Sequence, residues 1–467
     1  MKHFAVSVLV VLVMGCDPQA NPRSCIDGVC SDPEYPFCDV DGTFGGVEKE
    51  CINAGCPPGE FERCVGASAY RCNAFGNSFG VETCAYGCDD SLAGCRTCAT
   101  NSDCTPNAPV CDQSMNACRS CAADSECDSR VCDHGSCVDA ATILYAAPDG
   151  ASSATCSQND PCAASTAVMK AIVSVDPRTI HLASGLYASL TIPSAATQLT
   201  LVGEGATLSG DGGGLRVDAA ARVVGRGLEI TGVNDVLVCG SAGGALAKVS
   251  LSDSILLQPD TSRVVSAISC EVSLSATELR TADVGSPSSQ ATIALGTDGT
   301  LVGDRIHVHG LRTTVISMMG QRMTVRITNS LLENTWFLDL STDSGIPGSS
   351  ALFAWNTFVS RNSNTALDCS STTLRLANNI IFGTAVSNVL SGNACVTQTN
   401  VLMPQSPLPS GNIGSDPQFQ DVSAGNFRLK ASSPAVGTAA AKPPSDHDFA
   451  GVARPQGGAP DIGAYEQ

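Results

Sequence analysis

The sequence predicts an all-β protein whose main part is a right-handed parallel β-helix, capped by one N-terminal helix and preceded by a disulfide-rich, loop-rich region. Three observations predict this organisation. Eighteen of the 25 cysteines lie between Cys25 and Cys137. From Ile143 onward, short apolar runs recur in steps of 22 to 27 residues. Gly, Ser, Thr, Ala and Val dominate, and only 4% of residues are aromatic, a composition that favours strands and tight turns over helices.

The N-terminus indicates export. A basic start and an apolar run over residues 5–13 precede Cys16. The run is too short to span a bilayer, which takes about 20 apolar residues, and is typical of a signal peptide, here residues 1–15. Its end resembles the lipobox of bacterial lipoproteins. The resemblance implies cleavage before Cys16, a lipid on its sulfur and a lipidated tether over residues 16–24. An ordinary secretory signal with an incidental cysteine is the alternative.

The resemblance to lipoproteins also bears on location. We expect an exported protein that touches the membrane through its lipid only, at the outer membrane or cell surface. Asp17 resembles the inner-membrane retention residue of enteric lipoproteins, so sorting to the inner membrane stays open. No later stretch is long and apolar enough to span a bilayer.

Residues 25–138 form the predicted cysteine-rich repeat region. Without Cys16 an even number of cysteines remains, which in an exported chain predicts a disulfide framework. Two four-cysteine copies align closely, a third is looser, and a six-cysteine module separates them; the copies are 98–118, 121–137 and 25–51. The pattern resembles cysteine-rich repeats of surface lipoproteins from predatory and soil bacteria, which implies no activity.

Two close cysteine pairs in this region have the spacing of a zinc ribbon or a redox motif. They are Cys95–Cys98 and Cys118–Cys121. Each pair straddles a repeat boundary, and an exported chain favours disulfides over zinc, so we expect no metal ion and no cofactor. The net charge of −19 also argues against a nucleic-acid partner, because phosphates would repel the chain.

One helix is predicted before the β region. Asp160 is the expected N-cap, Pro161 the first helical residue, and apolar residues then follow at helical spacing until Pro177. A single amphipathic helix ahead of a solenoid is suited to cover its open end, where backbone groups would otherwise be unpaired.

The β region repeats once per coil over residues 143–411, and we interpret 412–467 as the C-terminal end of the β-helix. Aligning the apolar runs places the coil anchors at residues 226, 253, 277, 304, 329, 356, 378 and 400. Such steps fit one coil of a three-sided β-helix, whereas a propeller blade needs about 40 to 45 residues. Four asparagines share the anchor position in the last coils, and we expect them to stack and hydrogen-bond along the solenoid: Asn329, Asn356, Asn378 and Asn400.

The remaining cysteines fit the same register. Cys239 and Cys369 each lie 13 residues after a coil anchor (226 and 356). Cys270 and Cys395 each lie 17 residues after the anchor of the following coil (253 and 378). Because adjacent coils are about 4.8 Å apart, this spacing predicts the disulfides Cys239–Cys270 and Cys369–Cys395. A third disulfide, Cys156–Cys162, would close a small loop before the helix. Buried free thiols are the alternative.

The coils and the tail carry a family resemblance. Tyr145-Ala-Ala-Pro-Asp149-Gly150 and residues 179–187 resemble the pectate-lyase-like right-handed β-helix superfamily. Asp416-Pro417-Gln418-Phe419 and Asp461-Ile462-Gly463-Ala464-Tyr465-Glu466 look like the C-terminus of choice-of-anchor Q proteins, a group of bacterial surface β-helices. The resemblance implies a surface scaffold and carries over no activity. It also implies that Asp446-His447-Asp448 belongs to the end seal rather than to a metal or acid–base site.

One outward surface stands out as a candidate site. Apolar residues alternate inward along residues 305–309, so the side chains between them face solvent. In the predicted register Glu278 lies beside Arg305, Arg280 lies beside His307, and Arg361 shares the position of His309. We therefore expect a cationic patch for an acidic glycan, made of Glu278, Arg280, Arg305, His307, His309 and Arg361. An ordinary solvated sheet face is the alternative.

These observations favour a monomeric, surface-anchored structural, adhesive or glycan-binding protein, with an acidic polysaccharide or cell-surface glycan as its partner. The alternative is a polysaccharide lyase or glycoside hydrolase acting on uronate-containing glycans. A hydrolase needs two paired carboxylates, and a lyase needs a base beside a cation. The acidic residues of the β region are scattered among different coil positions, so we assign no catalytic residue.

Overall fold

A computed structural model of the chain divides into two compact units, Met1–Cys137 and Val138–Gln467. It describes residues 23–467 except 26–27, 43, 45–46, 54, 75, 77, 174–177, 197, 212, 242–243, 260–261, 282–290, 311–313, 334–337, 340–347, 361–366, 370–373, 393–394 and 441–444. The predicted signal peptide, Cys16 and Arg361 therefore lie outside the described residues. Among the described residues, no helix is long and apolar enough to cross a membrane.

The first unit is a series of small disulfide-bonded repeats. In each four-cysteine copy the first cysteine pairs with the third and the second with the fourth, which agrees with the alignment of the copies. These disulfides are Cys25–Cys38, Cys30–Cys51, Cys98–Cys111, Cys104–Cys118, Cys121–Cys132 and Cys127–Cys137. The six-cysteine module contains Cys56–Cys72, Cys64–Cys88 and Cys84–Cys95. Neither close cysteine pair is bonded internally, and all four sulfurs are used in disulfides, so neither pair is a zinc ribbon or a redox motif.

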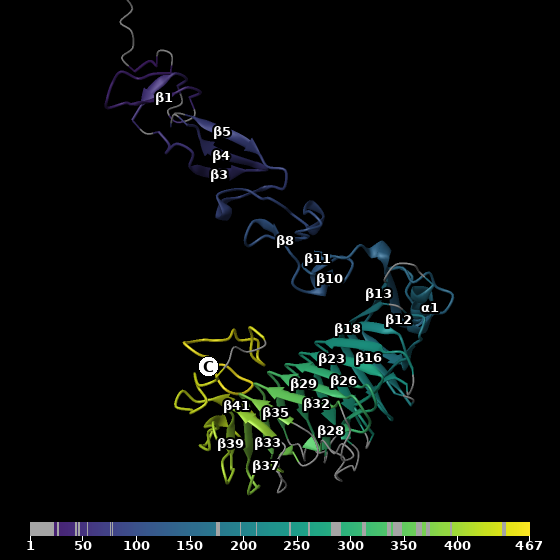
Figure 1. The fold of residues 1–467 in the computed structure, drawn as a ribbon. Coiled ribbons are helices and arrows are strands. Elements are labelled where there is room, and N and C mark those ends of the chain that lie inside the picture. The colour runs from purple at the N-terminus through teal and green to yellow at the C-terminus, as the bar shows by residue number, and fades with distance from the viewer. Residues whose placement is uncertain are drawn as a thin grey trace, which may run out of the picture. The chain divides into compact units, whose positions relative to one another are not determined.

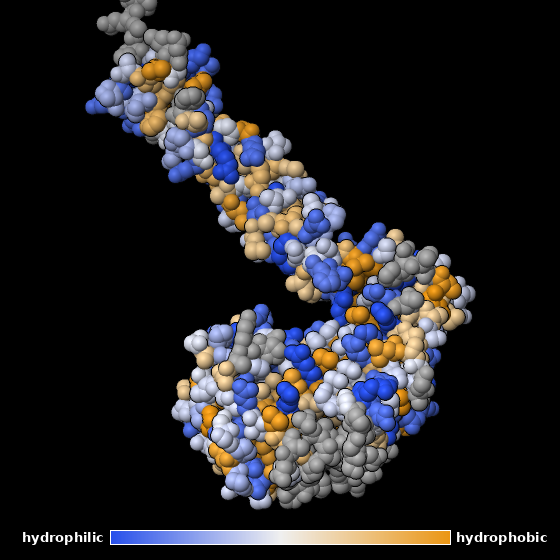
Figure 2. Space-filling model, viewed as in Figure 1, coloured by the Kyte–Doolittle hydropathy of each residue, from blue (hydrophilic) through white to orange (hydrophobic). Residues whose placement is uncertain are grey.

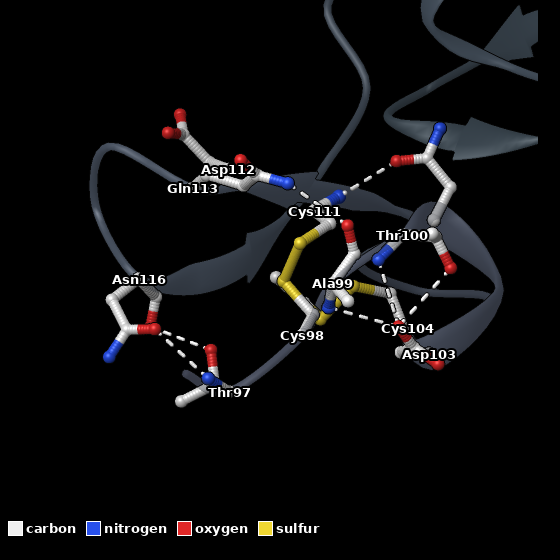
Figure 3. The surroundings of a disulfide bond; sticks show 12 residues. Thr97, Cys98, Ala99, Thr100, Asp103, Cys104, Cys111, Asp112, Gln113 and Asn116 are labelled. Carbon is white, nitrogen blue, oxygen red and sulfur yellow. Dashed lines mark hydrogen bonds between the residues drawn. A yellow bond between two sulfur atoms is a disulfide. The ribbon is translucent and has the colours of Figure 1, made fainter. Parts of the chain in front are cut away.

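Polar side chains replace a hydrophobic core in these repeats. Asp103 accepts hydrogen bonds from the backbone N–H of Ala99 and Thr100, next to the Cys98–Cys111 disulfide (Figure 3). Glu126, at the equivalent position 23 residues later, does the same for Ala122 and Ala123. So small a unit buries too little apolar surface to be stable alone, and disulfides with local hydrogen bonds take over that role.

The elements of this unit are short. They are β1 (Phe37–Asp39), β2 (Glu50–Ile52), β3 (Phe61–Val65), β4 (Ser68–Cys72), β5 (Phe79–Thr83), β6 (Cys88–Asp89), η1 (Asp90–Leu92), β7 (Gly94–Cys95), η2 (Asn101–Asp103), β8 (Val110–Asp112), β9 (Ala117–Arg119), η3 (Asp124–Glu126), β10 (Cys132–Asp133) and β11 (Ser136–Cys137). Their pairings are all antiparallel.

The second unit is the predicted parallel β-helix, which starts after η4 (Ala140–Thr142). Each coil adds a strand to each of three sheets, and the strands stack in parallel (Figure 1). The first sheet contains β12 (Ile143–Ala151), β13 (Arg178–Leu182), the starts of β16 (Leu199–Gly210) and β18 (Arg222–Gly232), β20 (Ala247–Ser252), β23 (Cys270–Ser275), β26 (Thr300–Asp304), β29 (Thr324–Thr328), β32 (Ser350–Ala354), β35 (Leu374–Ala377) and β38 (Cys395–Gln398).

Two further sheets complete the coils. The second sheet contains β14 (Gly185–Ala188), the ends of β16 and β18, β21 (Ile255–Gln258), β24 (Glu278–Thr281), β27 (His307–His309), β30 (Leu331–Glu333), β33 (Thr357–Ser360), β36 (Ile380–Gly383) and β39 (Val401–Met403). The third contains β15 (Leu190–Ile192), β17 (Leu215–Val217), β19 (Leu237–Gly240), β22 (Val265–Ile268), β25 (Ala291–Leu295) and β28 (Thr314–Met318), and then the ladder of β31 (Leu338–Asp339), β34 (Leu367–Asp368) and β37 (Leu390–Ser391). Inward side chains of all three sheets form one buried core.

A left-handed residue turns the chain from the first sheet to the second in successive coils. These corner residues have φ between 46° and 64°, and they are Gly227, Asp253, Ala276, Arg305, Asn329, Trp355, Asn378 and Thr399. The backbone N–H of Asp253 donates to Ser275, and that of Asn329 donates to Ala354, so each such bond links one coil to the next. The corner is thus held by backbone hydrogen bonds, whatever the side chain.

The asparagine ladder exists, but two of its four predicted members, Asn329 and Asn378, are wrong. The stacked residues are Asn356, Asn379, Asn400 and Asn412. The first three each directly follow a corner residue, and Asn412 extends the column by one more residue. Each side-chain amide donates to the next side-chain oxygen at 2.9 to 3.1 Å. Asn329 and Asn378 are instead corner residues, a position where asparagine tolerates positive φ.

The predicted helix is α1 (Ala164–Ile172), and it lies at the start of the solenoid. Its buried residues join the core of the first coil. The expected N-cap is wrong, because Ala163 is the N-cap and Asp160 accepts hydrogen bonds from Thr155. The Cys156–Cys162 disulfide closes this small loop, as predicted, with a Cα–Cα distance of 4.6 Å.

The two predicted inter-coil disulfides are present. Their Cα–Cα distances are 5.8 Å for Cys239–Cys270 and 5.2 Å for Cys369–Cys395. Cys239 pairs in register with Ala267, and Cys270 begins the next strand, with only Ser269 between that strand and β22. Each bridge therefore joins the third sheet of one coil to the first sheet of the next.

The C-terminal segment does not simply end the solenoid, because it also covers the side of the second sheet. β40 (Phe419–Asp421) and β41 (Asn426–Leu429) form a hairpin, and the residues after it run back along the coils. The backbone N–H of Gly463 donates to Asn378, and that of Ala464 donates to Thr357. Outward apolar residues of β30, β33, β36 and β39 are buried beneath this segment: Leu331, Val359, Ile380 and Val401.

Candidate functional site

The outward face of the second sheet carries polar and charged side chains on β24 and β27. Glu278 pairs in register with His307, and Arg280 pairs with His309. The predicted neighbours were therefore wrong by two residues. A register shift of two residues keeps each side chain on the same face of the sheet. Glu278, His307 and His309 therefore do lie together on the outward face. We call Glu278, His307, His309 and Glu333 of β30 the histidine–glutamate cluster.

Each histidine of this cluster contacts a carboxylate. His309 Nε2 lies 2.5 Å from Glu278 Oε1, and His307 Nε2 lies 2.6 Å from Glu333 Oε1. The two imidazole rings stack with their centroids 4.5 Å apart. Side-chain exposure is between 14% and 28%, so the cluster is partly sheltered while remaining open to solvent.

Glu278 is the centre of the cluster. Arg280 donates to its Oε1 from Nε at 2.9 Å and from Nη2 at 2.5 Å. Burial of the carboxyl raises its pKa, but hydrogen bonds from His309 and Arg280 and the positive charge of Arg280 lower it by more. The pKa of Glu278 therefore lies below its ordinary value, and the group is a carboxylate at neutral pH.

Both described arginines of the predicted cationic patch lie beside carboxylates. Arg280 is paired with Glu278, and Arg305 lies at a corner with its Nε 3.5 Å from Asp304 Oδ2. Arg361 lies outside the described residues. Because the arginines are compensated by carboxylates, the patch offers imidazole and carboxylate groups instead of net positive charge.

A different outward face carries three arginines without a carboxylate partner among the described residues. On the first sheet, Arg326 and Arg375 lie in one column, and Arg222 begins the adjacent column. All three side chains are exposed, and none forms an ion pair with the residues that the structure describes. Small hydroxyl side chains fill neighbouring outward positions: Ser250, Ser273, Thr300 and Thr324. We call these seven residues, with Lys248, the arginine–hydroxyl face.

A shallow groove crosses this face at β18, β20 and β23. It is lined by Gln198, Arg222, Val223, Val224, Lys248, Val249, Ser250, Glu271 and Ser273. Lys248 Nζ lies 2.5 Å from Glu271 Oε2, so that pair is neutral. On the side seen in Figure 2, hydrophilic residues of the solenoid are interspersed with single hydrophobic ones, as expected from strands whose side chains alternate.

The arginine–hydroxyl face was not among the predicted sites. The signal was present as alternation in two short segments, Lys248-Val249-Ser250 and Thr324-Val325-Arg326, with the apolar residue inward. It was missed because the arginines lie several coils apart, and only stacking in register brings them into adjacent columns.

The comparisons with known proteins assign this chain neither a family nor an activity. No family model matches the chain, and no curated protein matches it. Among solved structures, the chain is similar to the crystal structure of pectate lyase Pel9A, with 15% sequence identity and a TM-score of 0.40. The similarity covers 70% of this chain and 96% of that one.

Proposed function

We propose that this protein is an exported, lipid-anchored surface protein that binds acidic glycans along its arginine–hydroxyl face without cleaving them. The observation that carries the proposal is the set of exposed, uncompensated arginines Arg222, Arg326 and Arg375 in a chain of net charge −19. Arginine binds carboxylates and sulfates bidentately, and serine and threonine hydroxyls are suited to sugar hydroxyl groups.

The absence of cleavage is part of the proposal. A glycoside hydrolase needs two carboxyl groups about 5 to 9.5 Å apart, of which one carries a proton. The groove has one described carboxylate, Glu271, and it is paired with Lys248. The disulfide-bonded unit supports export, because such density of disulfides is stable in an oxidising compartment.

Glycan binding is tested with three arginine substitutions. In the full chain, Arg222→Ser, Arg326→Ser and Arg375→Ser together should weaken binding to polygalacturonate, alginate and heparin at least tenfold. The salt dependence of the remaining binding should flatten, because fewer ion contacts remain. A matched control changes three exposed arginines elsewhere, Arg216, Arg322 and Arg428, to Ser and alters the net charge equally.

Two outcomes would contradict the proposal. Equal weakening by both triple variants would indicate an effect of net charge alone. Release of unsaturated products or new reducing ends from any of these glycans would make the protein an enzyme, a polysaccharide lyase or hydrolase.

Lipidation is tested at Cys16. A Cys16→Ser variant should keep its signal peptide and move from the detergent phase to the aqueous phase in Triton X-114 partitioning. A lipid attached to sulfur cannot form without that cysteine. Fractionation identical to that of the wild type would show that the protein is not anchored in this way.

A further inference from the structure

The histidine–glutamate cluster has the composition and spacing of a metal site. One possible ligand atom from each of Glu278, His307 and His309 lies within 4.8 Å of the others. The two histidines project from one strand at positions i and i+2, and the glutamate projects from the adjacent coil in register with the first of them. Three potential ligands thus come from two neighbouring strands of one rigid sheet.

We propose that Glu278, His307 and His309 bind one divalent transition-metal ion of the zinc type. Two imidazole nitrogens and one carboxylate oxygen are ligands that zinc accepts, and three protein ligands leave a coordination position for water. Calcium prefers six to eight oxygen ligands, so it does not suit this set. Ligand atoms around a tetrahedral ion with bonds of about 2.0 to 2.2 Å lie roughly 3.3 to 3.6 Å apart. Small side-chain movements reach that spacing, because the Glu278 and His309 atoms are 2.5 Å apart and all three atoms lie within 4.8 Å of one another.

The surroundings favour that small movement. Glu333 holds the His307 ring through Nε2 at 2.6 Å, and carboxylate partners of this kind orient metal-binding histidines. Phe449 of the C-terminal segment packs edge-on against His307, with the ring centroids 5.9 Å apart. Arg280 competes for Glu278, but 46% of its side chain is exposed, so it can turn toward solvent when a cation binds.

Charge also favours a cation. The carboxylates of Glu278 and Glu333 face each other across the two imidazoles, and Arg280 is the cation that contacts Glu278 there. A divalent ion would take the place of the direct contact between His309 Nε2 and Glu278 Oε1. The site lies on a different sheet from the arginine–hydroxyl face, so its test is independent of glycan binding.

The test measures metal binding by the full chain, purified without a polyhistidine tag. Isothermal titration with zinc chloride should show one equivalent bound. His307→Ala and His309→Ala should each weaken zinc binding at least tenfold, and Glu278→Gln should weaken it as well. The matched control is His134→Ala, which removes an exposed histidine that also contacts a carboxylate, that of Asp133.

Circular dichroism and thermal unfolding of each apo-variant check that the fold is retained. If a histidine variant does not fold, the Glu278→Gln variant decides by the same titration. Zinc binding of equal affinity in wild type and in every folded cluster variant would overturn the proposal, as would the absence of zinc binding in the wild type. Calcium binding lost in the same variants, without zinc binding, would overturn the assignment to transition metals.

Discussion

Arg454→Ala should lower the free energy of unfolding by about 3 to 5 kcal/mol, the usual cost of removing one partner from a buried ion pair. Arg454 is 6% exposed, and it donates to the carbonyl oxygens of Asp461 at 3.1 Å and Gly463 at 2.8 Å. Its Nη1 lies 3.6 Å from the carboxylate of Glu466, which is equally buried. Without the guanidinium, the carboxylates around it would remain buried without a compensating charge.

We expect the Arg454→Ala substitution to detach the C-terminal segment partly from the second sheet. The acidic side chains around Arg454 anchor that segment, because Asp448 accepts from the backbone N–H of Val452 and Glu466, and Glu466 accepts from that of Gln456 and Asp461. Beneath the segment lie the outward apolar residues of β30 to β39. Their exposure should increase the fluorescence of a dye that binds apolar surface.

Urea unfolding followed by circular dichroism measures this effect. The control is Arg428→Ala in the same segment, where the guanidinium carbon lies 5.1 Å from the ring centroid of Tyr465 and the side chain is exposed. That contact contributes about 0.5 to 1 kcal/mol, so the control should be close to the wild type. An Arg454→Ala variant as stable as this control would show that the buried cluster does not hold the segment.

The position of the C-terminal segment was readable in part from the sequence. Leu331-Leu332 and Ile380-Ile381 are apolar on both faces of their strands, and continuous apolar runs of this kind indicate strands covered on both sides. Glu278-Leu279-Arg280 and His307-Val308-His309 alternate instead, and of their outward residues His307 packs against Phe449 of this segment. The apolar runs locate the coils, and their outward apolar residues also predict that another segment covers that side of the sheet.

The coil period could be predicted, whereas the exact register could not. Inward apolar residues recur in each coil because all of them line one core, and that signal is strong. The corner, however, is held by backbone hydrogen bonds, so residues as different as Asp253, Ala276, Arg305 and Trp355 occupy it. A position without a preferred side chain leaves no mark in the sequence. The predicted anchors Thr277 and Asp304 lie one residue after and one residue before the true corner residues, Ala276 and Arg305. The two errors add, so Glu278 was predicted beside Arg305 when it pairs with His307.

The inter-coil disulfides were predictable in spite of this error. A disulfide requires only that two Cα atoms lie about 4.4 to 6.8 Å apart, and the turns between sheets absorb small differences in offset. The candidate glycan face depends on which side chains stack directly, so it needed the structure.

Asn379→Asp should also lower the free energy of unfolding strongly, and the size of this loss should depend on pH. Asn379 Nδ2 donates to the carbonyl oxygen of Phe353 at 2.9 Å and to Asn400 Oδ1 at 3.0 Å. A carboxylate at this position, which is fully buried, would face both of those oxygens without a proton to donate. Unpaired buried acceptors cost about 1 to 3 kcal/mol each, so we expect a loss of about 3 kcal/mol or more at pH 7.

Lowering the pH should restore part of the stability that Asn379→Asp loses at pH 7. The introduced carboxyl would have a folded-state pKa above its unfolded value of about 3.9, because burial and the facing oxygens disfavour the charge. The destabilisation is therefore complete above the folded-state pKa and decreases as pH falls toward the unfolded one. Urea unfolding at pH 7 and pH 5 measures it, with Asn388→Asp as control, since Asn388 only accepts a hydrogen bond from Ser406 near the surface. An equal loss in both variants, or a loss that grows on acidification, would show that the asparagine ladder does not stabilise the coils through its amide donors.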